Sequence, residues 1–196
     1  MTSGGRILAL LTLTGLLACG GGSGGGSGGG SGTTGGGTGS LSLVYVDPPA
    51  GGYRFVRDAQ LSTATHLVLD LVGPEGDRGR GVAFSLTLPS GPAAWTAVAS
   101  GDSQYVENVL FNPGTGTPLL KSAIQGGTTL LADDFQKGAG NDLALNAPIC
   151  RVALDAQLPL AASPAIALQV VQFQMLPAAG NTLTTAPCSV GALSLQ

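Results

Sequence analysis

The sequence contains few charged residues, and fewer of them are basic than acidic. Only 10% of its 196 residues are charged, with 8 Lys and Arg against 11 Asp and Glu and a formal net charge of −3. The two lysines are Lys121 and Lys137, and the arginines are scattered. A nucleic-acid-binding surface needs clustered basic side chains that neutralise phosphates. The composition therefore argues against nucleic acid as a partner.

Histidine is nearly absent, which limits the catalytic and metal chemistry open to the chain. The one histidine, His66, lies in a predicted strand, and we interpret it as a solvent-facing residue rather than a base beside a nucleophile. One histidine and separated cysteines lack the close ligand pairs of zinc sites. The acidic stretch Asp133–Asp142 offers oxygen ligands for calcium, but its spacing matches no EF-hand, and a solvated loop is the alternative. We expect no metal, no cofactor and no enzymatic activity.

The chain has no hydrophobic run long enough to span a bilayer, which takes about 20 apolar residues. The apolar stretch at residues 7–18 follows the single cation Arg6 and stops at Cys19, where glycine begins. This is the layout of a secretory signal. We therefore predict a cleaved signal peptide at residues 1–18 and an exported protein.

The end of that stretch, Leu16-Leu17-Ala18-Cys19, resembles the lipobox of bacterial lipoproteins. The resemblance implies that the Cys19 thiol is acylated and that several acyl chains hold the protein on a membrane of the cell envelope. Ordinary secretion, with Cys19 free or paired, is the alternative. In enteric bacteria, an aspartate directly after the cysteine resembles an inner-membrane retention signal. Gly20 occupies that position here, so we expect the outer membrane.

Residues 20–40 are glycine, serine and threonine only. Such a chain has nothing to bury and behaves as a flexible coil, with a root-mean-square span of roughly 25 Å for this length. We predict a lipidated tether at residues 19–40, followed by one domain at residues 41–196, which is long enough to bury a sizeable core.

Cysteine is scarce as well, and Cys150 and Cys188 are the two within the predicted domain. Disulfides persist in the compartments that exported proteins reach. We therefore predict a Cys150–Cys188 disulfide. Two buried thiols are the alternative.

The domain is instead rich in short segments that alternate apolar and polar residues between Gly, Pro, Asn and Asp, which indicates antiparallel strands. In the clearest one, Val82, Phe84, Leu86 and Leu88 point to one side, opposite small residues. The alternation shifts phase near Val170, which predicts a β-bulge. We predict an all-β, antiparallel two-sheet sandwich of about nine strands, at residues 41–46, 66–72, 81–89, 94–99, 105–111, 129–132, 149–158, 165–175 and 189–195.

The order of these segments resembles a cohesin domain. The first half of the likeness is the strand at 66–72, a polar glycine-rich turn, the strand at 82–88 and the segment Trp95–Asp102, and the second half is the last three strands. The resemblance implies a nine-stranded jelly roll of the carbohydrate-binding superfamily, used for binding and assembly. Cohesins bind dockerins, which implies a dockerin-like partner. The Tyr-Asp-Pro usual after the second strand is replaced by Pro89-Ser90-Gly91-Pro92, so the partner-binding surface differs from the family pattern.

We therefore expect a membrane-anchored binding or scaffolding module that holds a protein or a polysaccharide through a sheet face or loop tips. Aromatic side chains can stack on sugar rings, and Trp95 is the candidate ligand contact, with packing in the core as its alternative. A structural envelope lipoprotein without a soluble ligand is the competing interpretation, and a hydrolase ranks third.

Overall fold

In the computed structural model, residues 41–138, 142–157 and 162–196 are described, and they form strands, turns and loops without a helix. This part of the chain contains no helix long and apolar enough to cross a membrane. The strands are β1 (Leu43–Val46), β2 (Tyr53–Arg57), β3 (His66–Val72), β4 (Arg78–Thr87), β5 (Ala93–Thr96), β6 (Val106–Asn108), β7 (Leu120–Gln125), β8 (Thr129–Phe135), β9 (Leu143–Ala144), β10 (Pro148–Ala156), β11 (Ser163–Ile166), β12 (Gln169–Pro177), β13 (Thr184–Thr185), β14 (Cys188–Ser189) and β15 (Ala192–Leu195).

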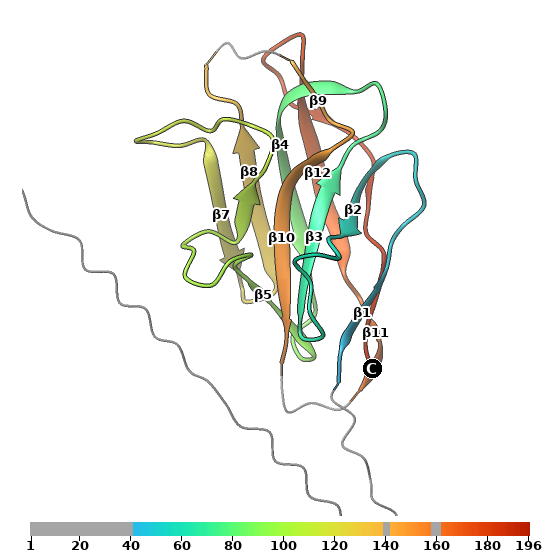
Figure 1. Ribbon diagram of the computed structural model, residues 1–196. Helices are drawn as coiled ribbons and strands as arrows, with labels where there is room; N and C mark the ends of the chain where they lie inside the picture. The colour runs from blue at the N-terminus through green and yellow to red at the C-terminus, as the bar shows by residue number, and fades with distance from the viewer. Residues whose placement is uncertain (1–40, 139–141, 158–161) are drawn as a thin grey trace, which may run out of the picture. The chain divides into compact units, whose positions relative to one another are not determined.

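The strands form three sheets, of which two make the layers of a β-sandwich (Figure 1). Sheet B has the order β14-β2-β3-β10-β5, with β6 also paired to β10. Sheet C has the order β13-β12-β4-β8-β7, with β9 also paired to β4. The small sheet A, β1-β15-β11, is linked to both, because β1 precedes β2 and β11 leads into β12. All strand pairs are antiparallel except β14–β2.

The core lies between sheets B and C, where the apolar sides of their strands meet. Rings from the two sheets are in direct contact: the Tyr53 and Phe173 centroids are 4.7 Å apart, and Phe55 meets Phe84 edge to face at 5.3 Å. Burial of apolar side chains that alternate along each strand is the main stabilising term in such a fold. The predicted inward side chains of β4, and that of Leu88 directly after it, are all buried, with 0 to 4% of their surface exposed: Val82, Phe84, Leu86 and Leu88.

The predicted all-β sandwich is confirmed, and eleven of the fifteen strands overlap or lie within segments expected from the sequence. The expected bulge near Val170 is present, because the β12–β4 register shifts between Val170 and Gln172. The expected single strand at 165–175 is divided into β11 and β12. Strands β2 and β7, and the two-residue strands β9 and β13, were not expected, and β14 overlaps the expected segment 189–195 at Ser189 alone.

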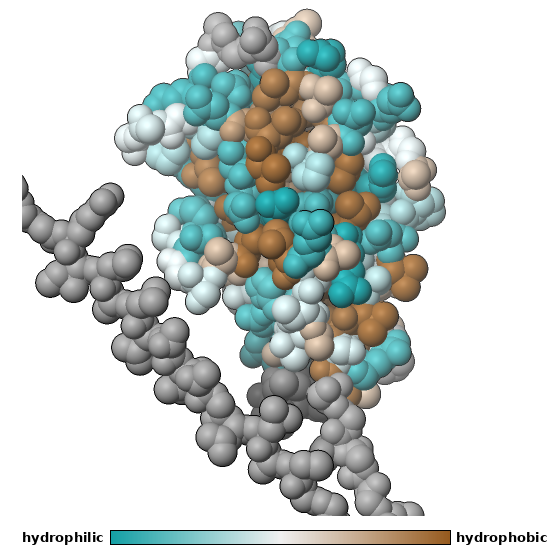
Figure 2. Space-filling model, in the orientation of Figure 1, coloured by the Kyte–Doolittle hydropathy of each residue, from teal (hydrophilic) through white to brown (hydrophobic). Residues whose placement is uncertain are grey.

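The outer side of sheet B is covered by the chain itself. The loop at residues 58–65 continues from β2 along the edge of β3, with hydrogen bonds from Asp58 N to Val68 O at 2.9 Å and from Val68 N to Ser62 Oγ at 3.0 Å, and Val68 has no exposed surface. Beside it, the Arg151 guanidinium pairs with three carboxylates, at 2.9 Å from Asp70, 3.3 Å from Glu107 and 3.5 Å from Asp58. In Figure 2 hydrophilic side chains interrupt the apolar areas over the face that β3 and β10 cross. This side is therefore occupied by internal contacts.

Candidate functional site

The outer side of sheet C differs from that of sheet B, because it presents a regular array of side chains from β7, β8, β4 and β12, all partly or fully exposed except Ser85, which is 8% exposed. Three rows of strand partners run across these four strands. We call this array the C face, and its twelve residues are Gln125, Thr129, Thr87, Gln169, Ala123, Leu131, Ser85, Gln172, Lys121, Asp133, Ala83 and Gln174.

The C face is nearly uncharged and combines amides, hydroxyls and one large apolar side chain. Lys121 and Asp133 are its two charged residues, and they are register partners on β7 and β8. Leu131 is 40% exposed in the middle of the face. An exposed leucine surrounded by neutral polar side chains resembles the centre of a protein interface, where charged residues are depleted.

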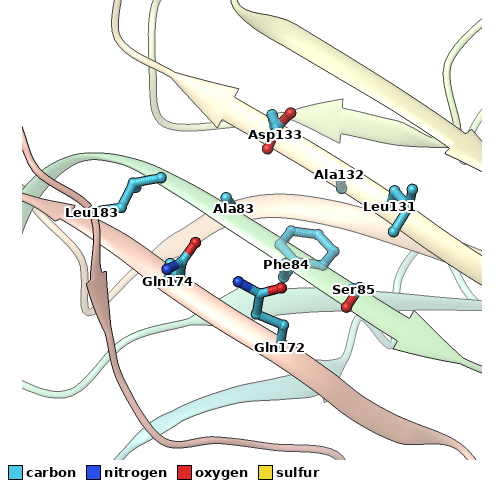
Figure 3. Close-up of a pocket in the computed structure, with 9 residues that line it drawn as sticks. All are labelled: Ala83, Phe84, Ser85, Leu131, Ala132, Asp133, Gln172, Gln174 and Leu183. Atoms are coloured by element: carbon cyan, nitrogen blue, oxygen red, sulfur yellow. The ribbon is translucent and has the colours of Figure 1, made fainter.

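Small side chains on β4 make the C face hollow. Ala83 and Ser85 form the floor, between Leu131 and Asp133 on β8 and Gln172 and Gln174 on β12 (Figure 3). Leu183, from the loop between β12 and β13, also lines this hollow of about 300 Å³.

A second hollow, of about 430 Å³, lies on the other side of β8, with Ala123 and Ser122 of β7 among its lining residues. Leu131 and Asp133 line both hollows and so form a ridge between them. The C face is therefore corrugated, with depressions on both sides of the β8 ridge.

At the edge of the sheet, the side chain of Gln104 takes the place of a further strand. Gln104 Oε1 accepts hydrogen bonds from Ser122 N at 2.9 Å and from Ser122 Oγ at 3.0 Å, and Tyr105 N donates to Ser122 Oγ at 2.8 Å. An edge strand with free backbone groups invites pairing with another chain. Gln104 caps the middle of β7, so the contact surface offered by sheet C is its face rather than its edge.

Trp95, the expected ligand contact, is a core residue. It is 8% exposed and donates a hydrogen bond from its indole Nε1 to the Thr128 carbonyl, at 2.9 Å. This bond joins β5 of sheet B to the turn between β7 and β8 of sheet C. The expectation of a ligand contact was wrong because the same alternation that places Ala93 inward in β5 also places Trp95 inward.

The predicted Cys150–Cys188 disulfide is not formed either, because both residues are free thiols. Cys150 is on β10 and Cys188 on β14, which are three strand positions apart in sheet B. Spacings of about 4.8 Å separate their Cα atoms by roughly 14 Å, whereas a disulfide needs less than about 7 Å. Burial raises the pKa of the Cys188 thiol to about 12 and that of Cys150 well above its usual range. The alternative of two buried thiols holds for Cys150, while Cys188 is partly exposed.

The other candidate residues take structural positions. Asp133 and Asp134 point to opposite sides of β8, one exposed and one buried, so their carboxylates cannot bind one calcium ion together. No group of three or more potential metal ligands occurs among residues 41–138, 142–157 and 162–196. His66 Nδ1 lies within hydrogen-bond distance of Asp155 Oδ1, at 2.7 Å, at the first residue of β3. Cys19, the predicted lipidation site, lies outside the described residues.

Sequence reasoning missed most of the C face, although a signal for it was present. Leu120, Ser122 and Ile124 alternate with Lys121, Ala123 and Gln125, which is the period-two pattern of a strand. The small residues Ala83, Ser85 and Thr87 were assigned to the outer side of β4, but their floor position becomes visible only when β8 and β12 are placed beside them.

Comparisons with known proteins give structural neighbours but no sequence relatives. No protein-family model matches the chain, and no curated protein matches it. It is similar to the seventh ScaB type I cohesin from Pseudobacteroides cellulosolvens, with 11% identity and a TM-score of 0.46, over 71% of this chain and 88% of the other. It is also similar to a cohesin module from a Clostridium perfringens family 33 glycoside hydrolase, with 13% identity and a TM-score of 0.41, over 80% and 95%.

Proposed function

We propose that the domain is a non-catalytic binding module for a protein partner and that the C face is its contact surface. The observation that carries the proposal is the contrast between the two sandwich faces. Sheet B is covered by its own loop and by the Arg151 ion pairs, whereas sheet C presents Leu131 and two hollows to solvent. Binding energy in protein interfaces comes mainly from a few well-packed central residues, and Leu131 with the β4 floor provides such a centre.

The distribution of aromatic residues favours a protein over a polysaccharide as the partner. Sugar-binding surfaces commonly use exposed aromatic rings for stacking. The chain has one Trp, three Tyr and five Phe, all within the described ranges, and none belongs to the exposed class. Tyr105 and Phe135 are partly buried, and the other seven are core residues. The glutamines and the leucine of the C face are suited to a protein surface, for which the sequence resemblance to cohesins suggests a dockerin.

The test compares two variants that place a charge at matched positions. Leu131 on the C face is 40% exposed, and Leu61 in the loop over sheet B is 41% exposed. Leu131→Glu should weaken partner binding about tenfold or more, because it buries a carboxylate in the interface, while Leu61→Glu should bind as the unchanged protein does.

The partner is first isolated by affinity capture from the secreted and envelope proteins of the source organism. Titration calorimetry with the captured protein, and with a recombinant dockerin, then measures the affinity of each variant. An equal loss of affinity in Leu131→Glu and Leu61→Glu would overturn the proposal. Binding of a polysaccharide without a stoichiometric protein partner would overturn it as well. Failure to capture any ligand would favour a structural lipoprotein.

We further propose that the module is exported and held to a membrane, the outer one, by lipid on Cys19. The lipobox-like Leu16–Cys19 and the glycine-rich stretch after it support this proposal. Cys19→Ser should move the protein from the detergent phase to the aqueous phase in detergent phase separation. Unchanged partitioning would contradict lipidation without affecting the proposal for the C face.

A further inference from the structure

Asp134 is a carboxyl group enclosed in the sandwich interior. Along β8, Leu130, Ala132 and Asp134 share the buried side, and Asp134 has no exposed surface. Neither of its carboxylate oxygens has a hydrogen-bond partner among the described residues. Its register partners are Val82 on β4 and Leu120 on β7, both apolar. A buried carboxylate without a partner is strongly destabilising, so such a group is expected to bind a proton.

The surroundings of Asp134 favour its neutral form. Burial raises its pKa from the ordinary 3.8 to about 7. The titratable group that faces it from sheet B is Cys150 of β10, whose pKa is raised by burial and then by the charge of Asp134. On β8 itself Asp133 points to the opposite side, and the β7 cation Lys121 lies on that same outer side. From β4, one cation shares the inner side with Asp134.

That cation is Arg80. Against β12 the strand is irregular between Gly79 and Gly81, but against β8 its pairing is regular up to Gly81↔Phe135 and continues at Arg80, which places Arg80 on the same side of β4 as Val82 and Phe84. Its Nε is buried and has no hydrogen-bond partner among the described residues, while its Nη2 donates to the Gly180 carbonyl and, at 3.1 Å, to Asn181 Oδ1. Gln136 N donates to the Arg80 carbonyl at 2.7 Å, which pairs position 80 with position 136, two residues after Asp134.

Arg80 and Asp134 are thus diagonal neighbours across the β4–β8 ladder. Diagonal positions in antiparallel sheets are about 7–8 Å apart, within reach of a long side chain. Each residue carries a buried polar atom without a partner, one a donor and the other an acceptor. These atoms would satisfy each other if the guanidinium turned inward, at the cost of its bonds to the loop at residues 178–183.

We propose that Arg80 and Asp134 form a proton-controlled switch. With Asp134 protonated, Arg80 holds the 178–183 loop through Gly180 and Asn181; when Asp134 ionises, Arg80 turns inward, pairs with the carboxylate and releases the loop. A carboxylate and a neutral acid differ in their affinity for a guanidinium, and this difference shifts the equilibrium between the two arrangements.

The switch also regulates the C face, a consequence that rests on the function proposed above. Leu183 belongs to the loop that Arg80 holds, and it lines the hollow over β4. Release of the loop removes this wall from the hollow. Partner binding should therefore be tighter when Asp134 is protonated than when it is ionised.

The experiment follows the switch by nuclear magnetic resonance on the full chain, without any partner. The Gly180 backbone amide and the Arg80 Nε–H are monitored between pH 5 and pH 9. We expect both to shift with a common midpoint near neutrality in the unchanged protein, and to stay constant in Asp134→Asn. Asp133→Asn, which removes the neighbouring carboxylate on the other side of β8, is the matched control and should keep the transition.

A Gly180 signal that does not titrate, or that titrates equally in Asp134→Asn, would overturn the switch, as would an Arg80 Nε–H that keeps one position while Asp134 ionises. Because no partner is present, these outcomes are independent of the fate of the C-face proposal. If the Leu131→Glu variant binds the partner normally, the C-face proposal is overturned and the switch is unaffected.

Discussion

Phe84 lies where the two sheets meet, with its ring against Phe55 and 4% of its surface exposed. Three residues later on the same strand, Thr87 points to the C face and is partly exposed. The two side chains therefore experience opposite environments although they share one strand. The β4 alternation indicated this difference directly, because a period of two in a sheet assigns each residue to one side.

Phe84→Ala should lower the free energy of unfolding by about 3–5 kcal/mol, because it removes buried apolar surface and leaves a cavity. Thr87→Ala should change it by less than about 1 kcal/mol, as outward-facing substitutions normally do. Urea denaturation of both variants measures the difference. Equal midpoints would show that the inner side of β4 is assigned wrongly.

The two thiols provide a second test at the level of single residues. Burial raises the pKa of both, so little thiolate exists at pH 8, and both should react slowly with an alkylating agent in the folded protein. Cys188, which is partly exposed, should react before the fully buried Cys150. Peptide mass spectrometry after denaturation without reductant should find both labelled, whereas two unlabelled cysteines would indicate a disulfide.

At the scale of elements, β4 and β8 fit together through a glycine and an aromatic ring. Gly81 and Phe135 are register partners, and a Cβ added at Gly81 would overlap the Phe135 ring. The Phe135 ring covers Gly81 at the end of the β4–β8 ladder, beyond the last row of the C face. A side chain at position 81 has to displace the ring.

Gly81→Ala should cost about 1–3 kcal/mol through this overlap. In a Phe135→Ala background the same substitution should cost less, because the space is then free. A double-mutant cycle from thermal or denaturant unfolding gives the coupling between the two positions. Strict additivity would mean that Phe135 does not occupy the space over Gly81.

The sequence predicted strands well where apolar and polar residues alternate over several residues, and poorly where the strand depends on its neighbours. His66–Val72 was predicted to the residue, but Val68, Asp70 and Val72, which were expected on the open side, are buried as well. Two-residue strands such as Thr184–Thr185 have no period of their own. They form because Met175 and Gln174 present free backbone groups to them.

The same limit applies to the candidate site. The outward position of Ser85 could be read from β4 alone, but the hollow requires Leu131 and Gln172, which come from strands distant in sequence. For Trp95, core packing, the alternative to a ligand contact, is correct, and the alternation within β5 was enough to indicate it. Sites on single strands are thus visible in the sequence, whereas sites across strands are not.

At the scale of the whole molecule, Asp134 makes the stability of the fold depend on pH. Its pKa is about 7 in the folded protein and near 3.8 when unfolded, so the unfolded chain loses its proton first as the pH rises. The contribution of Asp134 to stability is therefore fully present below about pH 4 and is lost as the pH rises to about 7, by ~1.4 kcal/mol per pH unit and up to ~4 kcal/mol in total.

Asp134→Asn should remove this slope, and the comparison of unfolding free energies for the two proteins at pH 5 and pH 8 isolates it from other groups. Arg80→Gln should extend the decline to higher pH at the same slope, since the ionised carboxylate then has no cation to turn to. A parallel decline in all three proteins would assign the pH dependence to other residues.

The two ends of the domain meet at one point: Ser42 N donates to the Gln196 carbonyl, Gln196 N donates to the Ser42 carbonyl, and β1 and β15 continue this antiparallel ladder from Leu43↔Leu195 to Val46↔Ala192. The hydrogen bonds of such a ladder run perpendicular to the strands. In the proposed arrangement, a load applied between the N-terminal stretch before residue 41 and a partner held on sheet C would pull β1 along its axis and strain its bonds to β15 together in shear. A load applied between the tether and the C-terminus opens the same bonds one after another. The domain should therefore resist drag on a captured partner better than tension between its own ends, and pulling by atomic force microscopy in the two geometries would give two different rupture forces.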